Sequence, residues 1–309
     1  MKIVTLTLNP AFDVHCFAKN FQPFHENLAK ILANDAGGKG INISRALTAN
    51  GAENTALVVL GRKNSEKFRQ SLDADGISYR EIAVEGRIRE NFTLHTDNAP
   101  ETRISFSGFA ADDRLIHTVE EELDKLLATG DILTFTGRNP EGVGMERVKM
   151  MLKKFRDRGV RIVLDSRSFG KQDMIAVRPW LIKPNEEEIA AYADVEVRNF
   201  RDAKIAAEAL RKEGIENVMI SLGGQGAMLC CAEGCYVAHA PQIDVLSTIG
   251  AGDSAIAGFC AAAIEGASPI EMLRRAVAYG SAACMSEGTR PPKPKNVQAL
   301  LSMIKTEKF

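Results

Sequence analysis

The pattern of apolar and polar residues predicts strands and helices that alternate along the chain. Short apolar runs, typical of buried strands, occupy 3–8, 55–61, 131–137, 160–165, 180–182 and 218–222. Helical spacing of apolar positions is found between them, at 39–50, 64–74, 113–128, 144–158, 200–213, 250–266 and 269–286. Strands that alternate with helices are typical of a parallel sheet covered by helices. The pattern therefore predicts an α/β fold with a mostly parallel sheet.

Two segments, about 11–36 and 86–107, interrupt this alternation. Neither has helical periodicity, and both contain short alternating runs, as in 91–96 and 102–106, which predict antiparallel strands. The second segment lies between units of the α/β core. We expect the two to form a small sheet that acts as a lid, because ligands of open α/β sheets bind at the carboxyl ends of the strands and a cover there excludes water. No long linker appears, so the chain, 1–309, is predicted to be one domain with a lid.

The charge balance narrows the classes of partner. Among 309 residues, 39 Lys and Arg oppose 40 Asp and Glu, for a net charge of −1. Such a balance gives no general reason to bind nucleic acid or an anionic membrane. No apolar run reaches the roughly 18–20 residues that cross a bilayer, and the opening MKIVTLTLNP predicts a first strand instead of a signal peptide. We expect a soluble, reduced, cytoplasmic protein.

The six cysteines are scattered along the chain, so a disulfide framework is not expected. Three of them, Cys230, Cys231 and Cys235, cluster closely enough to suggest a metal site. No second Cys pair or His pair stands nearby, and the flanking residues predict a hairpin. The hairpin is therefore favoured over the metal site, and no metal ligand is assigned with certainty.

The most informative segment is 247–254, Ser-Thr-Ile-Gly-Ala-Gly-Asp-Ser, at the start of a predicted helix. Glycines there let backbone N–H groups converge on an anion, and the helix dipole adds partial positive charge. The carboxylate of Asp253 is placed to accept a proton from a hydroxyl. An anion site beside a base is what phosphoryl transfer to an alcohol requires. Taken alone, however, the segment is better explained by Asp253 as a first-turn acid or cap and by glycines that only aid packing.

A second glycine-rich segment, 35–42, also opens a helix, and it contains Gly38, Lys39 and Asn42. Its backbone can approach a ligand closely, and Lys39 supplies a cation; the alternative is a turn with a solvated lysine. A P-loop needs Ser or Thr after its Gly-Lys, where Gly40 stands, and the dinucleotide fingerprint GxGxxG is missing.

The remaining motifs are weak when each is taken alone. The run 221–226, Ser-Leu-Gly-Gly-Gln-Gly, is by itself more typical of a hairpin turn than of a nucleotide site. The run 183–188, Lys-Pro-Asn-Glu-Glu-Glu, suits the start of a helix, and 9–13, Asn-Pro-Ala-Phe-Asp, a plain turn. Three arginines stand in the predicted lid or at strand ends: Arg89, Arg103 and Arg138.

The order of these motifs is far more specific than any one of them. NPAFD, GGKGIN, KPNEEE, SLGGQGA and STIGAGDS, in that order, resemble the ribokinase-like carbohydrate kinases, and within them the phosphofructokinase B family. The resemblance runs from about Thr5 to Gly288. It is closest to the 1-phosphofructokinases and tagatose-6-phosphate kinases, and it implies a ribokinase-like fold, ATP and Mg²⁺.

The resemblance also implies residue roles. Asp253 would be the general base, and Gly250, Ala251 and Gly252 the anion hole. The nucleotide would lie along Ser221, Leu222, Gly223, Gly224, Gln225 and Gly226, with Thr248 and Gly252 nearby. Asn185 and Glu188 match a family pair that influences Mg²⁺ carried by ATP. The sugar would be bound by Asp13, Gly38, Lys39, Asn42 and Arg89, with Arg103 and Arg138 as further cations.

One departure affects the expected substrate. Where the family usually has Gly-Ser-Leu-Pro, this chain has 137–140, Gly-Arg-Asn-Pro. A small hydroxyl is replaced by the long cation of Arg138 at a position expected to face the sugar. Phosphoryl transfer is unaffected by this change, whereas the identity of the sugar phosphate is open.

The leading hypothesis is an ATP-dependent kinase of a ketohexose phosphate, with fructose 1-phosphate converted to fructose 1,6-bisphosphate. A phosphate monoester carries about −1.5 to −2 charge and needs several donors, which suits the number of cations near the site. Alternatives are a tagatose-6-phosphate kinase, a neutral-sugar kinase and, in another class, a non-catalytic sugar-phosphate sensor. Family resemblance and exposed lid strands favour a homodimer joined through the lid.

Overall fold

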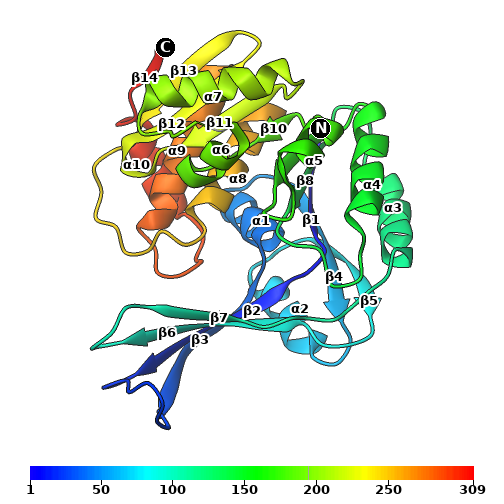
Figure 1. The fold of residues 1–309 in the computed structure, drawn as a ribbon, viewed down its shortest axis with the longest axis vertical. Helices are drawn as coiled ribbons and strands as arrows, with labels where there is room; N and C mark the ends of the chain where they lie inside the picture. Colours follow the sequence, from blue (N-terminus) through cyan, green and yellow to red (C-terminus); the bar gives the residue numbers. More distant parts are fainter. Residues whose placement is uncertain (194) are drawn as a thin grey trace.

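The computed structural model describes residues 1–193 and 195–309, which form a large sheet, a small sheet and the helices around them (Figure 1). The large sheet has the strand order β14-β13-β12-β11-β10-β9-β8-β1-β4-β5. Its strands are β1 (Ile3–Thr7), β4 (Asn54–Gly61), β5 (Tyr79–Val84), β8 (Ile132–Thr136), β9 (Arg161–Asp165), β10 (Leu181–Ile182), β11 (Asn217–Ser221), β12 (Gly226–Cys231), β13 (Gly234–His239) and β14 (Thr306–Lys308). Pairing is parallel from β11 to β5 and antiparallel from β11 to β14.

Helices cover both faces of this sheet because its strands are apolar on both sides. One face, with Val4 and Leu6 of β1, packs against α3 (Arg114–Leu126), α4 (Met145–Asp157), α5 (Lys171–Val177), α6 (Glu186–Ala193) and α7 (Phe200–Lys212). The other face, with Ile3 of β1, packs against α1 (Lys39–Ala49), α8 (Ala251–Ile264), α9 (Pro269–Cys284) and α10 (Pro294–Leu301). The α/β fold with a mostly parallel sheet is confirmed.

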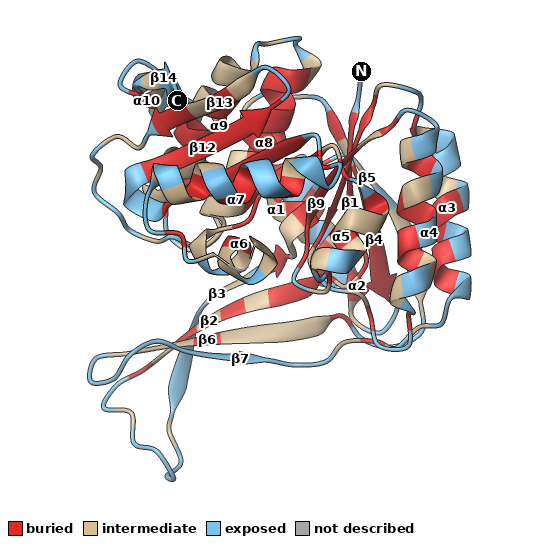
Figure 2. Ribbon diagram, turned by 45° about the horizontal axis from the view of Figure 1, so that its top comes forward, coloured by how far each residue is buried: buried red, intermediate tan, exposed pale blue. Residues whose placement is uncertain are grey.

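The small sheet projects from the body, and its outer half is exposed (Figure 2). It has the strand order β3-β2-β6-β7, from β3 (Ala29–Gly37), β2 (Ala11–Ala18), β6 (Arg89–Thr96) and β7 (Thr102–Ser105). The two interrupting segments of the sequence thus do form one small sheet. Its pairing was only partly predicted, because the central strands β2 and β6 run parallel, while β3 and β7 are antiparallel to their neighbours.

The base of the small sheet is attached to the body beside the carboxyl end of β1. β1 ends at Thr7 and β2 begins at Ala11, so only a short turn separates the two sheets. Phe12 of β2 packs edge-on against Phe68 of α2 (Ser65–Ala74), with ring centroids 5.4 Å apart, in a cluster that includes Val58 of β4. This packing holds the first residues of β2 and the last of β3 against the large sheet.

The hairpin expected around Cys230 is β12–β13, but the expectation that its cysteines are reduced is wrong. Cys230 and Cys235 face each other across the hairpin and form a disulfide. Cysteines that are scattered along the chain gave no sign of this pair, because two residues come within disulfide reach once a hairpin places them opposite each other. Cys231, the neighbour between them, is free and buried.

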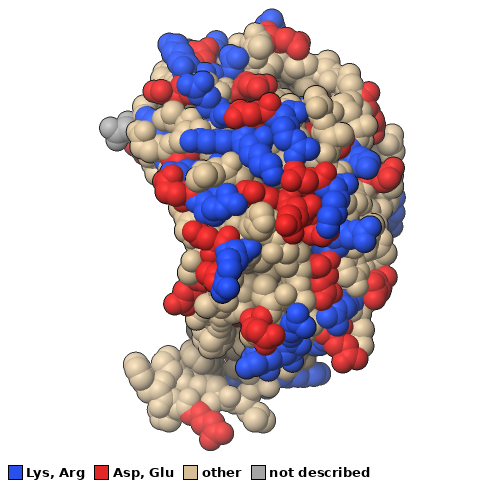
Figure 3. Space-filling view, turned by 90° about the vertical axis from the view of Figure 1, so that its right-hand side faces the viewer, with Lys and Arg blue, Asp and Glu red and all other residues tan. Residues whose placement is uncertain are grey.

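The surface is mixed in charge. On the face that carries α3 and α4, Lys and Arg alternate with Asp and Glu, and no broad patch of one sign is visible (Figure 3). Within the described residues, no helix is both long enough and apolar enough to span a bilayer.

Candidate active site

Polar side chains gather at the carboxyl edge of the large sheet. Asn9 follows β1, Arg138 follows β8, Asp165 ends β9, Lys183 follows β10 and Ser221 ends β11. These strands are neighbours and run in the same direction, so residues just beyond them lie along one edge. Ligands of open α/β sheets bind at this edge. The candidate site is built here, with α1 and α8 beginning on one side and the small sheet on another.

The start of α8 provides an anion site and a buried carboxylate on one helical turn. Gly250 precedes the helix with φ of 77°, in the left-handed region that glycine adopts without strain. The first N–H groups of a helix lack intrahelical partners and favour an anion. Asp253 follows in the first turn; its side chain is buried, and its Oδ2 accepts a hydrogen bond of 2.9 Å from Asn42 Nδ2 on α1.

Burial raises the pKa of Asp253 to about 6. This pKa is the net result of burial, the largest cause, together with the nearby charges: Lys39, the hydrogen bond from Asn42 and Lys183 lower it, and the carboxylate of Asp165 raises it. A carboxylate with a pKa of about 6 is ionised at neutral pH and is a stronger base than an ordinary aspartate. It therefore combines the charge state and the proton affinity that a general base needs.

Lys39, the first residue of α1, forms an ion pair that the sequence analysis did not foresee. Its Nζ lies 2.9 Å from Oδ2 of Asp165, at the end of β9. Burial acts to lower the pKa of Lys39, but Asp165 and Asp253 outweigh burial and raise it above its usual value. Burial would likewise raise the pKa of Asp165, and Lys183 and Lys39 hold it below its usual value. The signal in the sequence was the Asp that ends the apolar run 160–165.

Asp13 lies at the base of the small sheet, against the glycine-rich segment. Its Oδ1 accepts a hydrogen bond of 2.9 Å from Asn91 Nδ2. A Cβ atom placed on Gly37 would stand 2.1 Å from Asp13 Oδ2, so only glycine fits beside this carboxylate. Gly38 follows with φ of 123° and begins α1. The structure thus brings Asp13, Gly38, Lys39 and Asn42 to one wall of the site.

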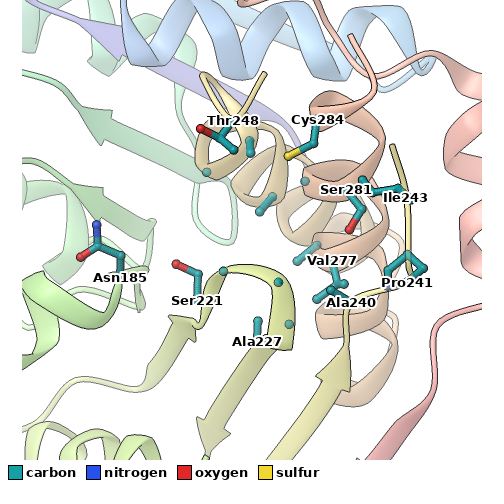
Figure 4. A pocket seen from close by; sticks show the side chains of 18 of the residues that line it. Asn185, Ser221, Ala227, Ala240, Pro241, Ile243, Thr248, Val277, Ser281 and Cys284 are labelled. Carbon is teal, nitrogen blue, oxygen red and sulfur yellow. The ribbon is translucent and has the colours of Figure 1, made fainter. Parts of the chain in front are cut away.

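A cavity of about 740 Å³ lies between β11, α8 and α9. Figure 4 shows Asn185 and Ser221 on one side of it and Thr248 and Cys284 on the other. Its apolar part includes Ile243 and Val277, and glycines and Lys183 line its polar part. Of the residues expected to bind nucleotide, those that line the cavity are Asn185, Ser221, Gly223, Gly224, Gly226, Thr248 and Gly252, together with Ala251 of the expected anion hole.

Three other residues expected at the nucleotide point elsewhere. The Leu222 side chain is buried in the hydrophobic core. Gln225 Nε2 donates to the backbone oxygen of Arg198, 3.4 Å away. Glu188 and Asn185 cap the start of α6, because each side chain accepts a hydrogen bond from the other's backbone N–H, at 3.2 and 2.8 Å. The Asn-x-x-Glu run therefore caps a helix, and Asn185 also lies at the cavity wall.

The polar part of the cavity fits a chain of phosphates. A Cβ atom on Gly223 or Gly224 would meet no atom within 4 Å, so their backbone is open to a ligand. A Cβ atom on Gly252 would stand 3.0 Å from Lys183 Nζ, so glycine keeps free the space between the helix start and this cation. Lys183 is the first residue of the KPNEEE motif, and no role was predicted for it from the sequence.

The three candidate arginines are not all brought together. Arg89 and Arg138 line a second cavity of about 320 Å³, with Asn9 and Asn139 among the other lining residues. Arg103 lies on β7, at the edge of the small sheet; it is exposed and lines neither cavity. The grouping of Arg103 with the other two is thus not supported by the geometry.

Comparison with known proteins relates this geometry to a family. Residues 11–296 match the model of the pfkB family carbohydrate kinases. The 1-phosphofructokinase of Escherichia coli K12 is 31% identical over 308 residues, which is 100% of this chain and 99% of that protein. The ATP-dependent 6-phosphofructokinase isozyme 2 of the same strain is 29% identical over 293 residues, 94% of each.

A solved structure shows the same arrangement of the whole chain. The crystal structure of Escherichia coli phosphofructokinase-2 in complex with substrates and products has a TM-score of 0.90 and 28% identity, over 98% of this chain and 99% of that one. The family model and the full-length relatives agree with the order of motifs and with the fold. The chain belongs to the pfkB family of carbohydrate kinases, enzymes that phosphorylate sugars and sugar phosphates.

Proposed function

We propose that this kinase transfers the γ-phosphoryl group of ATP to fructose 1-phosphate and forms fructose 1,6-bisphosphate. The observation that carries the proposal is the position of Asp253. It is a buried carboxylate with a raised pKa, next to the nucleotide cavity through Ala251 and Gly252 and next to the expected sugar wall through Asn42. A base between a nucleotide cavity and a polyol site is suited to phosphorylating a hydroxyl.

Each group has a defined task in this mechanism. Asp253 accepts the proton of the attacking hydroxyl, which Asn42 and Asp13 help to orient. Gly250, Ala251 and Gly252 direct backbone N–H groups at the phosphoryl oxygens, where charge is stabilised during transfer. Lys183 adds a positive charge beside Gly252. Lys39, held by Asp165, adds a second on the sugar side.

Mg²⁺ accompanies ATP in this proposal, and the donor groups present suit it. Asn185 lines the nucleotide cavity, whereas Glu188 caps the start of α6 beside it and would act on the ion only through Asn185 or a bound water. Amide and carboxylate oxygens are ligands that Mg²⁺ accepts, usually with retained water and phosphate oxygens. The ion would neutralise phosphate charge during transfer.

The relatives divide between two fructose phosphates. A relative at 31% identity is named 1-phosphofructokinase, and one at 29% identity is named 6-phosphofructokinase. We choose fructose 1-phosphate because several curated relatives at 29 to 31% identity carry the 1-phosphofructokinase name. Tagatose 6-phosphate and neutral sugars are the alternatives. A sensor without turnover has no use for the raised pKa of Asp253.

The test is ADP release with ATP, Mg²⁺ and a panel of acceptors. The panel is fructose 1-phosphate, fructose 6-phosphate, tagatose 6-phosphate and fructose. We expect the highest kcat/KM with fructose 1-phosphate. A higher kcat/KM with fructose 6-phosphate or tagatose 6-phosphate would overturn the choice of substrate. If none of the four acceptors leads to ADP release, the proposed function is wrong.

We also propose that the chain forms a homodimer through its small sheet. Large apolar side chains are exposed on the outer part of this sheet and its loops, namely Phe24, Leu28, Ile31, Leu32, Ile104 and Phe106. Edge strands and exposed apolar side chains favour pairing with another chain. A second copy would cover both.

A further inference from the structure

Arg45 is a buried arginine on α1 that has no task in the mechanism described so far. It is 6% exposed, and each of its three side-chain nitrogens donates a hydrogen bond. Nε donates to Asp75 Oδ2 at 2.7 Å, and Nη2 donates to the backbone oxygen of Ala36 at 2.6 Å. Nη1 donates to Asn42 Oδ1 at 3.2 Å. A charge is costly to bury without such partners, so the guanidinium is held in one position among them.

The hydrogen bond to Asn42 determines which end of its amide faces the proposed base. An asparagine side chain has an oxygen that accepts and a nitrogen that donates, whereas a guanidinium has donors alone. Arg45 therefore requires Asn42 to turn Oδ1 toward it, and Nδ2 then points to the other side, where it donates to Asp253 Oδ2 at 2.9 Å. With the amide rotated by half a turn, two donors would face each other at Arg45 and two acceptors would face each other at Asp253.

The hydrogen bond from Asn42 acts on Asp253 in two ways. It stabilises the ionised carboxylate, and so it lowers the pKa of Asp253 against the rise that burial causes. It also occupies Oδ2, so the other oxygen, Oδ1, is the one left to take a proton from a hydroxyl. The charged groups that act on Asp253 directly come from three other positions: Lys39 begins α1, Asp165 ends β9 and Lys183 follows β10.

The C-terminal end of α2 holds Arg45 from the other side. Asp75 follows the last residue of α2, and its side chain is 33% exposed. One turn earlier, Ser71 Oγ accepts a hydrogen bond of 3.4 Å from the backbone N–H of Ala36. Ala36 is thus bound on both sides, through its N–H to Ser71 and through its oxygen to Arg45. The end of α2 therefore fixes Arg45 together with the segment that leads into Gly38 and α1.

We propose that Arg45 is a positioning residue for phosphoryl transfer, which orients the amide of Asn42 so that Asp253 presents Oδ1 to the acceptor hydroxyl. The inference rests on the proposed function, because it takes Asp253 as the base. Arg45 lines neither of the two cavities described above, so its effect reaches the reaction through Asn42. A purely structural arginine, which only ties α1 to α2, would affect folding and leave the protonation of Asp253 unchanged.

The kinetic test compares Arg45→Met with Arg69→Met. Methionine is of similar length and donates no hydrogen bond. Arg69 also joins α2 to a neighbouring element, through two hydrogen bonds to Glu81 of β5 at 2.6 and 2.8 Å, and it lines neither cavity. We expect Arg45→Met to lower kcat by about ten- to a hundredfold, to leave KM for ATP near that of the parent, and to move the acid limb of the kcat profile to higher pH. Arg69→Met should keep the limb of the parent.

The conservative variant Arg45→Lys keeps the positive charge and one flexible donor group, so it should recover part of the lost kcat. If Arg45→Met does not fold, Asp75→Asn answers the same question, because it keeps the arginine and one acceptor for Nε. We expect a smaller shift of the acid limb in the same direction. An acid limb at the parent's position in the variants of Arg45 and Asp75, or an equal shift in Arg69→Met, would overturn the inference.

An NMR titration separates this inference from the proposed function, because it needs no turnover. In protein labelled with ¹³C at the aspartate carboxyls, the signal of Asp253 is the one that Asp253→Asn removes. Its midpoint should lie at higher pH in Arg45→Met than in the parent and in Arg69→Met. That result supports the orienting role even if the acceptor proves not to be a sugar phosphate. An equal midpoint in Arg45→Met and the parent would overturn the inference, even if the parent were an active kinase.

Discussion

At the scale of single residues, the site depends on charges that are costly to bury. Lys39, Asp165 and Lys183 lie close enough to Asp253 to influence its pKa. Two carboxylates and two ammonium groups nearly balance, so burial is tolerated while one carboxylate retains a raised pKa. This arrangement lowers the free energy of unfolding and makes Asp253 a stronger base.

A first prediction concerns the effect of Asp253→Asn on stability and on kcat. The folded-state pKa of about 6 lies above the ordinary value of 3.8. Folding therefore favours the protonated carboxyl, and this contribution to stability is present below about pH 4 and is lost as the pH rises through 6. At pH 7 the amide should raise the free energy of unfolding by about 1–3 kcal/mol while kcat falls by about 10²–10⁴-fold.

Thermal unfolding at pH 7 and steady-state kinetics check the two halves of that prediction. An amide variant that turned over within a few-fold of the parent would show that Asp253 is not the base. In the parent, kcat should decline below about pH 6, where Asp253 becomes protonated.

A second prediction concerns the partners of Asp253 and uses two substitutions with opposite effects. Asp165→Asn removes a neighbouring negative charge and frees Lys39, so the acid limb of the kcat profile should move to lower pH. Lys39→Met removes a positive charge, so the limb should move to higher pH, and KM for the sugar phosphate should rise more than KM for ATP. Shifts in the same direction would refute the coupling between these groups.

At the scale of elements, glycines at the start of a helix determine how closely a ligand can approach the backbone. Gly252 lies inside the first turn of α8, where alanine has the better helix propensity by about 1 kcal/mol. A Cβ atom there meets only the flexible end of Lys183, 3.0 Å away. We predict that Gly252→Ala keeps or raises the thermal stability and weakens ATP binding several-fold. Calorimetry with ATP and a melting curve would check both; unchanged ATP affinity would remove Gly252 from the nucleotide site.

The alternation of apolar runs and helical stretches predicted most of the large sheet, because strands buried on both faces are continuous apolar runs. β5 was not predicted, since Tyr-Arg-Glu-Ile-Ala-Val mixes charged and apolar residues, as a strand at the edge of a sheet does. The three-residue β14 and the seven-residue α5 are too short to show a period. The parallel pairing of β2 with β6 joins segments separated by two helices and three strands, and the local pattern of residues does not indicate it.

The same limit applies to the site. Motifs placed Asp253, Asn42 and Lys39 on the correct elements, because glycines next to a helix start are visible in the sequence. The Lys39–Asp165 pair joins residues 126 positions apart and required the order of the strands. The direction of the Leu222 side chain followed from strand alternation only once the end of β11 was known.

At the scale of the whole molecule, the outer part of the small sheet exposes several large apolar side chains. Ile31 and Leu32 of β3 are 59% and 57% exposed. If the small sheet joins two copies, the double substitution Ile31→Lys and Leu32→Lys should convert a dimer to a monomer in sedimentation equilibrium. The control Met150→Lys, at a methionine of α4 that is 60% exposed, should stay dimeric. A parent that sediments as a monomer at micromolar concentration would refute the homodimer.

The loop that carries Arg138 has a consequence for how the site can be altered. The residues proposed for phosphoryl transfer stand on α8 and α1, whereas Arg138 stands in a separate loop anchored by backbone and serine contacts that do not involve its side chain. Replacement of this one side chain leaves the anchors and the base in place. A substitution at position 138 would therefore change what the loop presents to the second cavity without changing the proposed base or anion site.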